Sequence, residues 1–100
     1  ENMKGDTARK TVTVTNPQGF HMRPAQEFVL IAGPYAGTVN VCRPGNPPVS
    51  GKSILGLLTL GAEQNQVLEV EVTGPDAKGT LEKLLHVFEK TYDEETEPAH

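Results

Sequence analysis

Residues 67–72 form the clearest alternation of apolar and charged side chains in the chain. The alternating residues are Leu68, Glu69, Val70, Glu71 and Val72. Because successive side chains of a strand point to opposite faces, this period of two predicts a strand with a buried aliphatic face and an acidic face toward solvent. A chain that contains such a strand has to cover one side of a sheet and leave the other side open.

Two other segments also show strand patterns. The segment 11–15 alternates Thr with Val, and the segment 38–42 carries two valines on one face. The Pro-rich stretch 44–48 predicts a stiff turn that leads into a short edge segment at 49–50. These patterns predict four strands in all, counting the one at 67–72.

Apolar residues at helical spacing predict two amphipathic helices. The first stripe consists of Ala25, Phe28, Val29 and Ala32. Gly33 and Pro34 end it, and Pro24 suits its first turn, where the missing N–H costs little. The second stripe follows a turn at 74–76 and consists of Leu81, Leu84, Leu85, Phe88 and Tyr92.

A third, shorter helix is predicted from Ile54 to Leu60, with Ser53 as its N-cap and Gly61 just past its end. Its two turns carry more aliphatic side chains than one core-facing stripe needs. Two readings stay open: Leu55 and Leu58 remain exposed for a partner, or the whole helix is buried.

The order β-α-β-β-α-β-α predicts an α+β fold: an open-faced two-layer sandwich with a four-stranded, mostly antiparallel sheet and three helices on one face. A chain of 100 residues can fill only one core. We expect one domain at 10–92, a flexible leader at 1–9 and an acidic flexible tail at 93–100.

Composition and charge exclude several classes of function. The net charge of −4 argues against nucleic-acid binding, and no apolar run approaches the ~20 residues that cross a bilayer. Cys42 is the only cysteine, and His86 and His100 lie apart from His21, so we expect no disulfide, metal or cofactor. These features predict a cytoplasmic protein that does not bind membranes.

The segment around His21 carries the candidate chemistry. His21 stands where a turn meets the first helix, and the amides and positive dipole end of a helix N-terminus favour an anion. Arg23 adds a forked cation suited to phosphate oxygens, and imidazole is a nucleophile near neutral pH. From these residues alone, a phosphoryl carrier and a simple helix cap with a solvated arginine remain equally open.

The segment from Gly19 to Ala25 resembles the active-site signature of HPr, the histidine-containing phosphocarrier family of the phosphoenolpyruvate:sugar phosphotransferase system. The segment from Ser50 to Leu57 resembles the regulatory-serine region of the same family. The resemblance implies that Nδ1 of His21 is phosphorylated and that Arg23 stabilises the phosphate. Met22 departs from the family pattern, which usually has a small residue there.

The resemblance also implies partners and an absence of independent turnover. Enzyme I would donate the phosphoryl group, an IIA-type domain would accept it, and HPr kinase/phosphorylase would modify Ser53. The protein is expected to be a monomer that docks these partners around the histidine and the second helix. The expected docking residues are Phe20, Met22, Pro24, Ile54, Leu55 and Leu58.

Two alternatives of a different class remain. One is a mainly regulatory protein that acts through phosphorylation of Ser53 with little traffic through His21. The other is a noncatalytic ligand-binding α+β module.

Overall fold

A computed structural model describes residues 6–90, which form seven helices and strands in the predicted order. The elements are β1 (Thr7–Thr13), α1 (Met22–Ala32), β2 (Thr38–Cys42), β3 (Val49–Ser50), α2 (Ile54–Thr59), β4 (Val67–Thr73) and α3 (Ala77–Glu89). Residues 1–5 of the predicted leader lie outside the described residues, as do the predicted tail at 93–100 and the helical position Tyr92.

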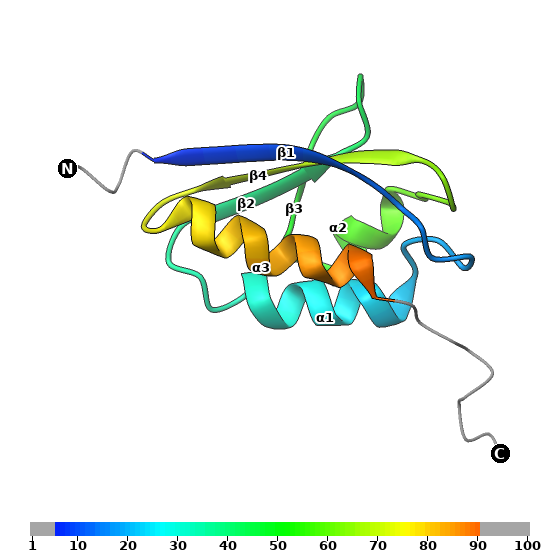
Figure 1. The fold of residues 1–100 in the computed structure, drawn as a ribbon, viewed down its shortest axis with the longest axis horizontal. Coiled ribbons are helices and arrows are strands. Elements are labelled where there is room, and N and C mark those ends of the chain that lie inside the picture. The colour runs from blue at the N-terminus through cyan, green and yellow to red at the C-terminus, as the bar shows by residue number, and fades with distance from the viewer. Residues whose placement is uncertain (1–5, 91–100) are drawn as a thin grey trace, which may run out of the picture.

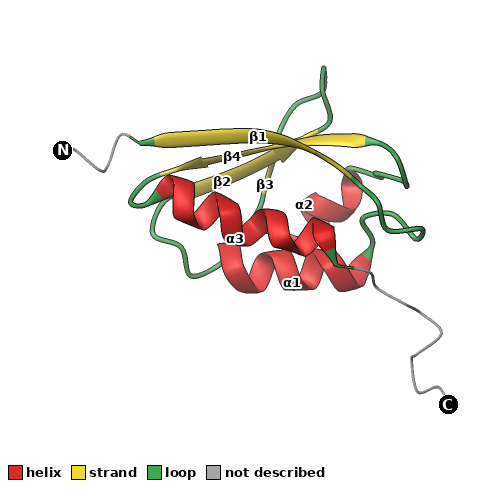
Figure 2. Cartoon of the chain, viewed as in Figure 1, coloured by secondary structure: helices red, strands yellow, loops and turns green. Residues whose placement is uncertain are grey.

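The sheet has the strand order β1-β4-β2-β3, and all its neighbouring strands are antiparallel. Strand β4 is central, with Val70 opposite Lys10 of β1 and Val41 of β2. The helices lie on one side of the sheet and leave the other side uncovered (Figures 1 and 2). The predicted α+β open-faced sandwich is therefore confirmed.

The alternation in β4 sorts its side chains as the sequence predicts. Leu68, Val70 and Val72 are fully buried beneath the helices. Glu69 and Glu71 face the open side, where Arg9 Nη2 donates to Glu71 Oε2 at 2.7 Å. This face therefore combines acidic and basic charge, rather than being purely acidic.

Strand β1 begins and ends earlier than the segment 11–15 predicted. Thr7 to Arg9 pair with β4, because Ala8 opposite Val72 and Arg9 opposite Glu71 continue the register of the two faces. Val14 leaves the ladder, since its N–H and C=O bond to the turn before β4. The predicted flexible leader at 1–9 is thus wrong for residues 7–9.

Three aromatic rings tie the helices together in the core. Phe20, which precedes α1, stacks on Phe88 of α3 with centroids 5.0 Å apart and meets Phe28 of α1 edge-on at 6.0 Å. All three side chains are buried. The segment that leads into α1 is therefore anchored from both helices.

The predicted end of the second helix needs a small correction, whereas the predicted start of the third is confirmed. Helix α2 ends at Thr59, one residue early, because Leu60 is its C-cap and Gly61 adopts a left-handed φ of +60°. Helix α3 begins at Ala77, and Asp76 precedes it as an N-cap whose Oδ1 accepts from the Gly79 N–H at 3.3 Å. The shortened helix α2 still includes Leu55 and Leu58.

Candidate functional site

The loop before α1 is held in one conformation by Gly19. Its φ is +78°, and a Cβ there would lie 2.6 Å from the carbonyl oxygen of Ala62. Asn16 binds it twice, since its C=O accepts from the Gly19 N–H at 2.8 Å and its Nδ2 donates to the Gly19 C=O at 3.0 Å. The Phe20 N–H adds a bond to the Ala62 C=O at 2.9 Å. These contacts fix the point at which His21 leaves the loop.

His21 is the N-cap residue of α1. Its backbone is extended (φ −105°), and its C=O accepts the N–H of Ala25 at 3.0 Å. Its imidazole makes no capping hydrogen bond, so the alternative of a histidine whose ring caps the helix finds no support. The ring is half-buried, and its Nε2 atom is buried.

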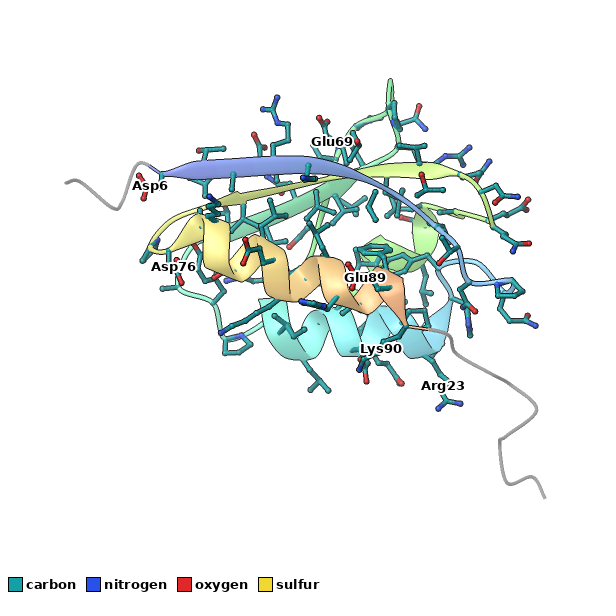
Figure 3. The ribbon with its side chains drawn as sticks, viewed as in Figure 1. Asp6, Arg23, Glu69, Asp76, Glu89 and Lys90 are labelled. Carbon is teal, nitrogen blue, oxygen red and sulfur yellow. The ribbon has the colours of Figure 1, made fainter. Side chains whose placement is uncertain are left out.

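The N-terminus of α1 offers a short anion cradle next to this ring. Met22 and Arg23 supply the first helical amides, whereas Pro24 has no N–H. The helix dipole adds partial positive charge at the same end. The exposed Arg23 side chain points away from the body of the helix at this end (Figure 3). The structure therefore brings an imidazole, backbone donors and a guanidinium to one helix terminus.

The predicted docking residues divide into buried and exposed sets. Phe20 is only 4% exposed and Pro24 is also buried, so the prediction that these two side chains contact a partner is wrong. Both residues fill the core beneath the histidine. Met22 is 45% exposed and Leu55 is 76% exposed, which excludes complete burial of α2.

The remaining residues of α2 show why its pattern exceeded one stripe. Leu57 points into the core and is fully buried, whereas Ile54 and Leu58 are half-buried. Leu30, which the sequence analysis did not select, is 75% exposed on α1. Its position outside the buried stripe of that helix is the signal that could have found it.

Ser53 is the N-cap of α2, as predicted. Its backbone is extended, and its Oγ accepts from the Gly56 N–H at 2.9 Å. The side chain is half-buried. The hydroxyl thus already satisfies one backbone donor of the helix without any modification.

Cys42 and His86 each lie close to a carboxylate. The Cys42 thiol lies 3.7 Å from Glu69 Oε1, and burial, followed by the charge of Glu69, raises its pKa above the ordinary value. His86 lies on the exposed side of α3, with Nδ1 3.2 Å from Glu89 Oε1. Asn65, in the turn before β4, adopts a left-handed conformation with φ of +74°.

The described residues contain neither a cluster of metal-ligating side chains nor a membrane-spanning helix. Between residues 6 and 90, no three His, Cys, Asp or Glu side chains gather where they could hold a metal ion. No helix within the same range is long and apolar enough to cross a bilayer. His100 lies outside the described residues.

Comparison with known proteins assigns the chain to a family. The family model described as "PTS HPr component phosphorylation site" matches residues 8–90, which is most of the chain. The chain belongs to the HPr family. Members of this family are phosphocarriers of the phosphotransferase system, and the predicted resemblance is therefore confirmed.

Individual relatives agree over nearly their full length. The phosphocarrier protein HPr of Treponema pallidum is 34% identical over 86 residues, which cover 86% of this chain and 97% of the relative. The phosphocarrier protein NPr of Escherichia coli is 28% identical over 89 residues, covering 89% and 99%. A crystal structure of HPr from Thermoanaerobacter tengcongensis superposes with a TM-score of 0.75 at 30% identity, covering 82% of this chain and 91% of that one.

Proposed function

We propose that this HPr-family protein accepts a phosphoryl group from phosphorylated enzyme I on Nδ1 of His21 and passes it to an IIA-type acceptor. The observation that supports this most strongly is the placement of His21 at the N-cap of α1 with its Nε2 buried. Burial of Nε2 makes Nδ1 the nitrogen better placed to meet an incoming phosphoryl group.

The proposed chemistry needs only a nucleophile and a fixed field of positive charge. The lone pair of neutral Nδ1 attacks phosphorus, an N–P bond forms, and the bond from phosphorus to the donor breaks with its electron pair leaving on the donor. Amides of Met22 and Arg23, with the Arg23 guanidinium, would stabilise the charge on the phosphoryl oxygens. The reverse sequence on an acceptor returns the imidazole to its starting state, so the protein has no independent turnover.

Partners would dock on the apolar surface beside this nucleophile. The exposed side chains of Met22 and Leu55, with the half-buried Ile54 and Leu58, supply that surface. Helices α1 and α2 contact each other, so both can meet one partner. We expect a cytoplasmic monomer that uses this surface for both donor and acceptor.

Regulation through Ser53 is a second proposal, which the cap geometry favours. A phosphoryl group on Oγ would place negative charge at the N-terminus of α2, where the helix dipole attracts it. HPr kinase/phosphorylase is the proposed modifying enzyme. A mainly regulatory role through Ser53 is the rival function, whereas family membership disfavours the unrelated ligand-binding module.

A labelling experiment tests the carrier proposal. Incubation with enzyme I and labelled phosphoenolpyruvate should produce an acid-labile phosphate that is absent in His21→Ala and retained in His86→Ala. His86 is a matched control because it is an exposed histidine on α3. Absence of label with every cognate enzyme I, combined with ATP-dependent labelling that Ser53→Ala removes, would favour the regulatory rival instead.

A further inference from the structure

Strand β1 has one edge that no other described strand covers. It is the outermost strand of the sheet and pairs only with β4 among the described residues. The C=O of Asp6, which precedes it, accepts the Gly74 N–H at 2.9 Å and so points toward the end of β4. Because backbone groups alternate in direction along a strand, those of Arg9 and Thr11, three and five residues later, point away from β4. The free edge therefore offers donors and acceptors to another extended chain.

The surface is hollowed between β1 and helix α3, which runs alongside it (Figure 1). This β1–α3 groove consists of two hollows of about 340 and 430 Å³ that share Lys10 and Leu85. The apolar side chains that line it are Ala8, Val12, Leu81, Leu85 and Phe88. The groove thus has space for apolar side chains on either side of Lys10.

Lys10 is a charged residue on the otherwise apolar side of β1. It lies opposite Val70, which is fully buried beneath the helices. Its neighbours on the same side of the strand are Ala8 and Val12. The Lys10 side chain is exposed, and within residues 6–90 no carboxylate pairs with its ammonium. The middle of the groove therefore presents a cation that can bind an anion from outside.

An extended segment that adds to β1 would present every second side chain to this groove. Positions two residues apart would then face Ala8, Lys10 and Val12 in turn. A carboxylate suits the middle position because it meets the ammonium, and apolar side chains suit the hollows on either side. Glu82 lines one hollow and Glu89 the other, so acidic side chains are disfavoured there.

We propose that the β1–α3 groove binds an extended segment of a partner protein by strand addition, with an acidic side chain next to Lys10 and an apolar side chain two residues to either side. This inference goes beyond the proposed carrier function. None of the residues assigned to docking enzyme I or its acceptor lines the groove. The protein thus has a second surface for a partner, separate from the one beside His21.

A second copy of this chain fits the free edge less well than an acidic segment. Lys10 is the middle residue of Thr7–Thr13, so two-fold pairing of two β1 strands would bring two lysines together. Like charges directly opposite each other destabilise a strand pair, and a lysine that points inward on an edge strand typically prevents such pairing. A partner that supplies a carboxylate replaces this repulsion with attraction.

Titration of the ¹⁵N-labelled full chain with the peptide acetyl-Thr-Leu-Thr-Glu-Thr-Leu-Thr-amide tests the groove. The backbone amide signals of Arg9 and Thr11 should shift and saturate, because their N–H groups gain acceptors. Lys10 is exposed, so Lys10→Glu should keep the fold but weaken binding about threefold to tenfold. A peptide with Lys in place of Glu should bind this variant better than it binds the original protein. Lys83→Glu is the matched control, since Lys83 is exposed on α3 outside the groove, and should change the affinity less than about twofold.

The inference is overturned if millimolar peptide leaves the Arg9 and Thr11 signals unchanged, or if Lys10→Glu binds both peptides as the original protein does. Hydrogen exchange of the same two amides without peptide distinguishes the other occupants, and fast exchange is expected. Slow exchange that becomes fast on dilution would identify a second copy at the edge. Slow exchange at every concentration would identify a segment of the chain itself, and either result overturns the partner proposal. The titration does not use enzyme I, so its outcome is independent of the labelling experiment.

Discussion

The His21 imidazole combines a half-buried ring, a buried Nε2 and a position at the first turn of α1. Each property has a separate cause in neighbouring residues. Phe20 fills the core before it, Gly19 fixes the approach of the chain, and Arg23 supplies charge two residues later. The proposed chemistry therefore depends on single residues whose roles can be tested one at a time.

Arg23→Ala should slow phosphoryl transfer from enzyme I by about 10- to 100-fold, because it removes a charged donor that would stabilise the negative charge on the phosphoryl oxygens in the transition state. Arg23 is exposed, so the thermal midpoint should stay close to that of the unsubstituted protein. Arg23→Lys should retain part of the rate, since it keeps the charge but loses the fork. Rapid-quench kinetics measure these rates, and an unchanged rate in Arg23→Ala would contradict the assigned role.

Gly19→Ala should lower the free energy of unfolding by about 2–4 kcal/mol. Alanine disfavours the left-handed backbone at this position, and its methyl group would clash with the Ala62 carbonyl oxygen. Gly45→Ala is the matched control. Gly45 has a φ of +89° but nothing within 4 Å of an added Cβ, so its cost should be limited to the backbone strain. Urea denaturation measures both, and equal losses would show that the contact with Ala62 is unimportant.

At the level of elements, one side of helix α2 packs on the core and the other side is exposed, and its aliphatic pattern alone does not separate the two sides. Leu57 holds it on the core, and Ser53 begins it with a hydrogen bond to Gly56. Leu55 on the opposite side is left to solvent. A helix this short depends on its cap and its one buried side chain, and its exposed side is available for recognition.

Ser53→Ala should cost about 1 kcal/mol of stability, because the Gly56 N–H loses its acceptor. Ser53→Asp should retain most of that stability, since a carboxylate also caps a helix and suits its dipole. Chemical denaturation of the two variants measures the difference. An Asp variant as unstable as the Ala variant would argue against the cap geometry and against an easily accommodated phosphate.

Leu55→Gln should weaken binding to enzyme I by about 1–2 kcal/mol while leaving the fold intact, because its side chain is exposed and apolar. Leu57→Ala has the opposite profile. Its cavity in the core should cost about 2–5 kcal/mol of stability. Calorimetric titration with enzyme I, paired with thermal melts, distinguishes the two, and unchanged binding by Leu55→Gln would remove α2 from the docking surface.

Strong periodic patterns predicted which helices and strands form. The ends of these elements and the tertiary contacts between them could not be predicted from the sequence. The alternation at 67–72 correctly predicted which side chains of β4 are buried and which face the open side. The start of β1 was missed because Arg9 looks like a tail residue until Glu71 is known to lie across from it. In the candidate site, the motif selected His21 and Arg23, whose roles stay predictions. Burial of Phe20 and Pro24 could not be deduced, since only the packed helices enclose them.

At the scale of the whole molecule, the helices cover one face of the sheet and the uncovered face holds polar and charged groups. Tyr35, in the loop after α1, donates its hydroxyl to the Pro75 C=O at 2.8 Å and so links this loop to the turn before α3. Burial, followed by the charges of Asp76 and Asp6, raises the pKa of this hydroxyl. Both this phenol and the Cys42 thiol therefore favour their protonated forms in the folded state.

Stability should consequently decline at alkaline pH. Groups whose pKa is higher in the folded state stabilise it fully below their unfolded pKa and lose that contribution as the pH rises through the folded pKa. The decline should begin near pH 9.0, the ordinary pKa of the thiol, and continue past 10.0, that of the phenol. Urea denaturation from pH 7 upward measures it. Cys42→Ala should flatten the first part of the curve, and an identical curve in this variant would contradict the argument.

The proposed function requires Nδ1 of His21 to carry the phosphoryl group. The most direct measurement is heteronuclear NMR of the protein labelled with ¹⁵N at its histidine rings, after phosphorylation by enzyme I and phosphoenolpyruvate. The predicted result is a single phosphorylated imidazole, that of His21, with the phosphorus bonded to Nδ1. Phosphate on Nε2 of His21, on another histidine, or on no histidine would contradict it.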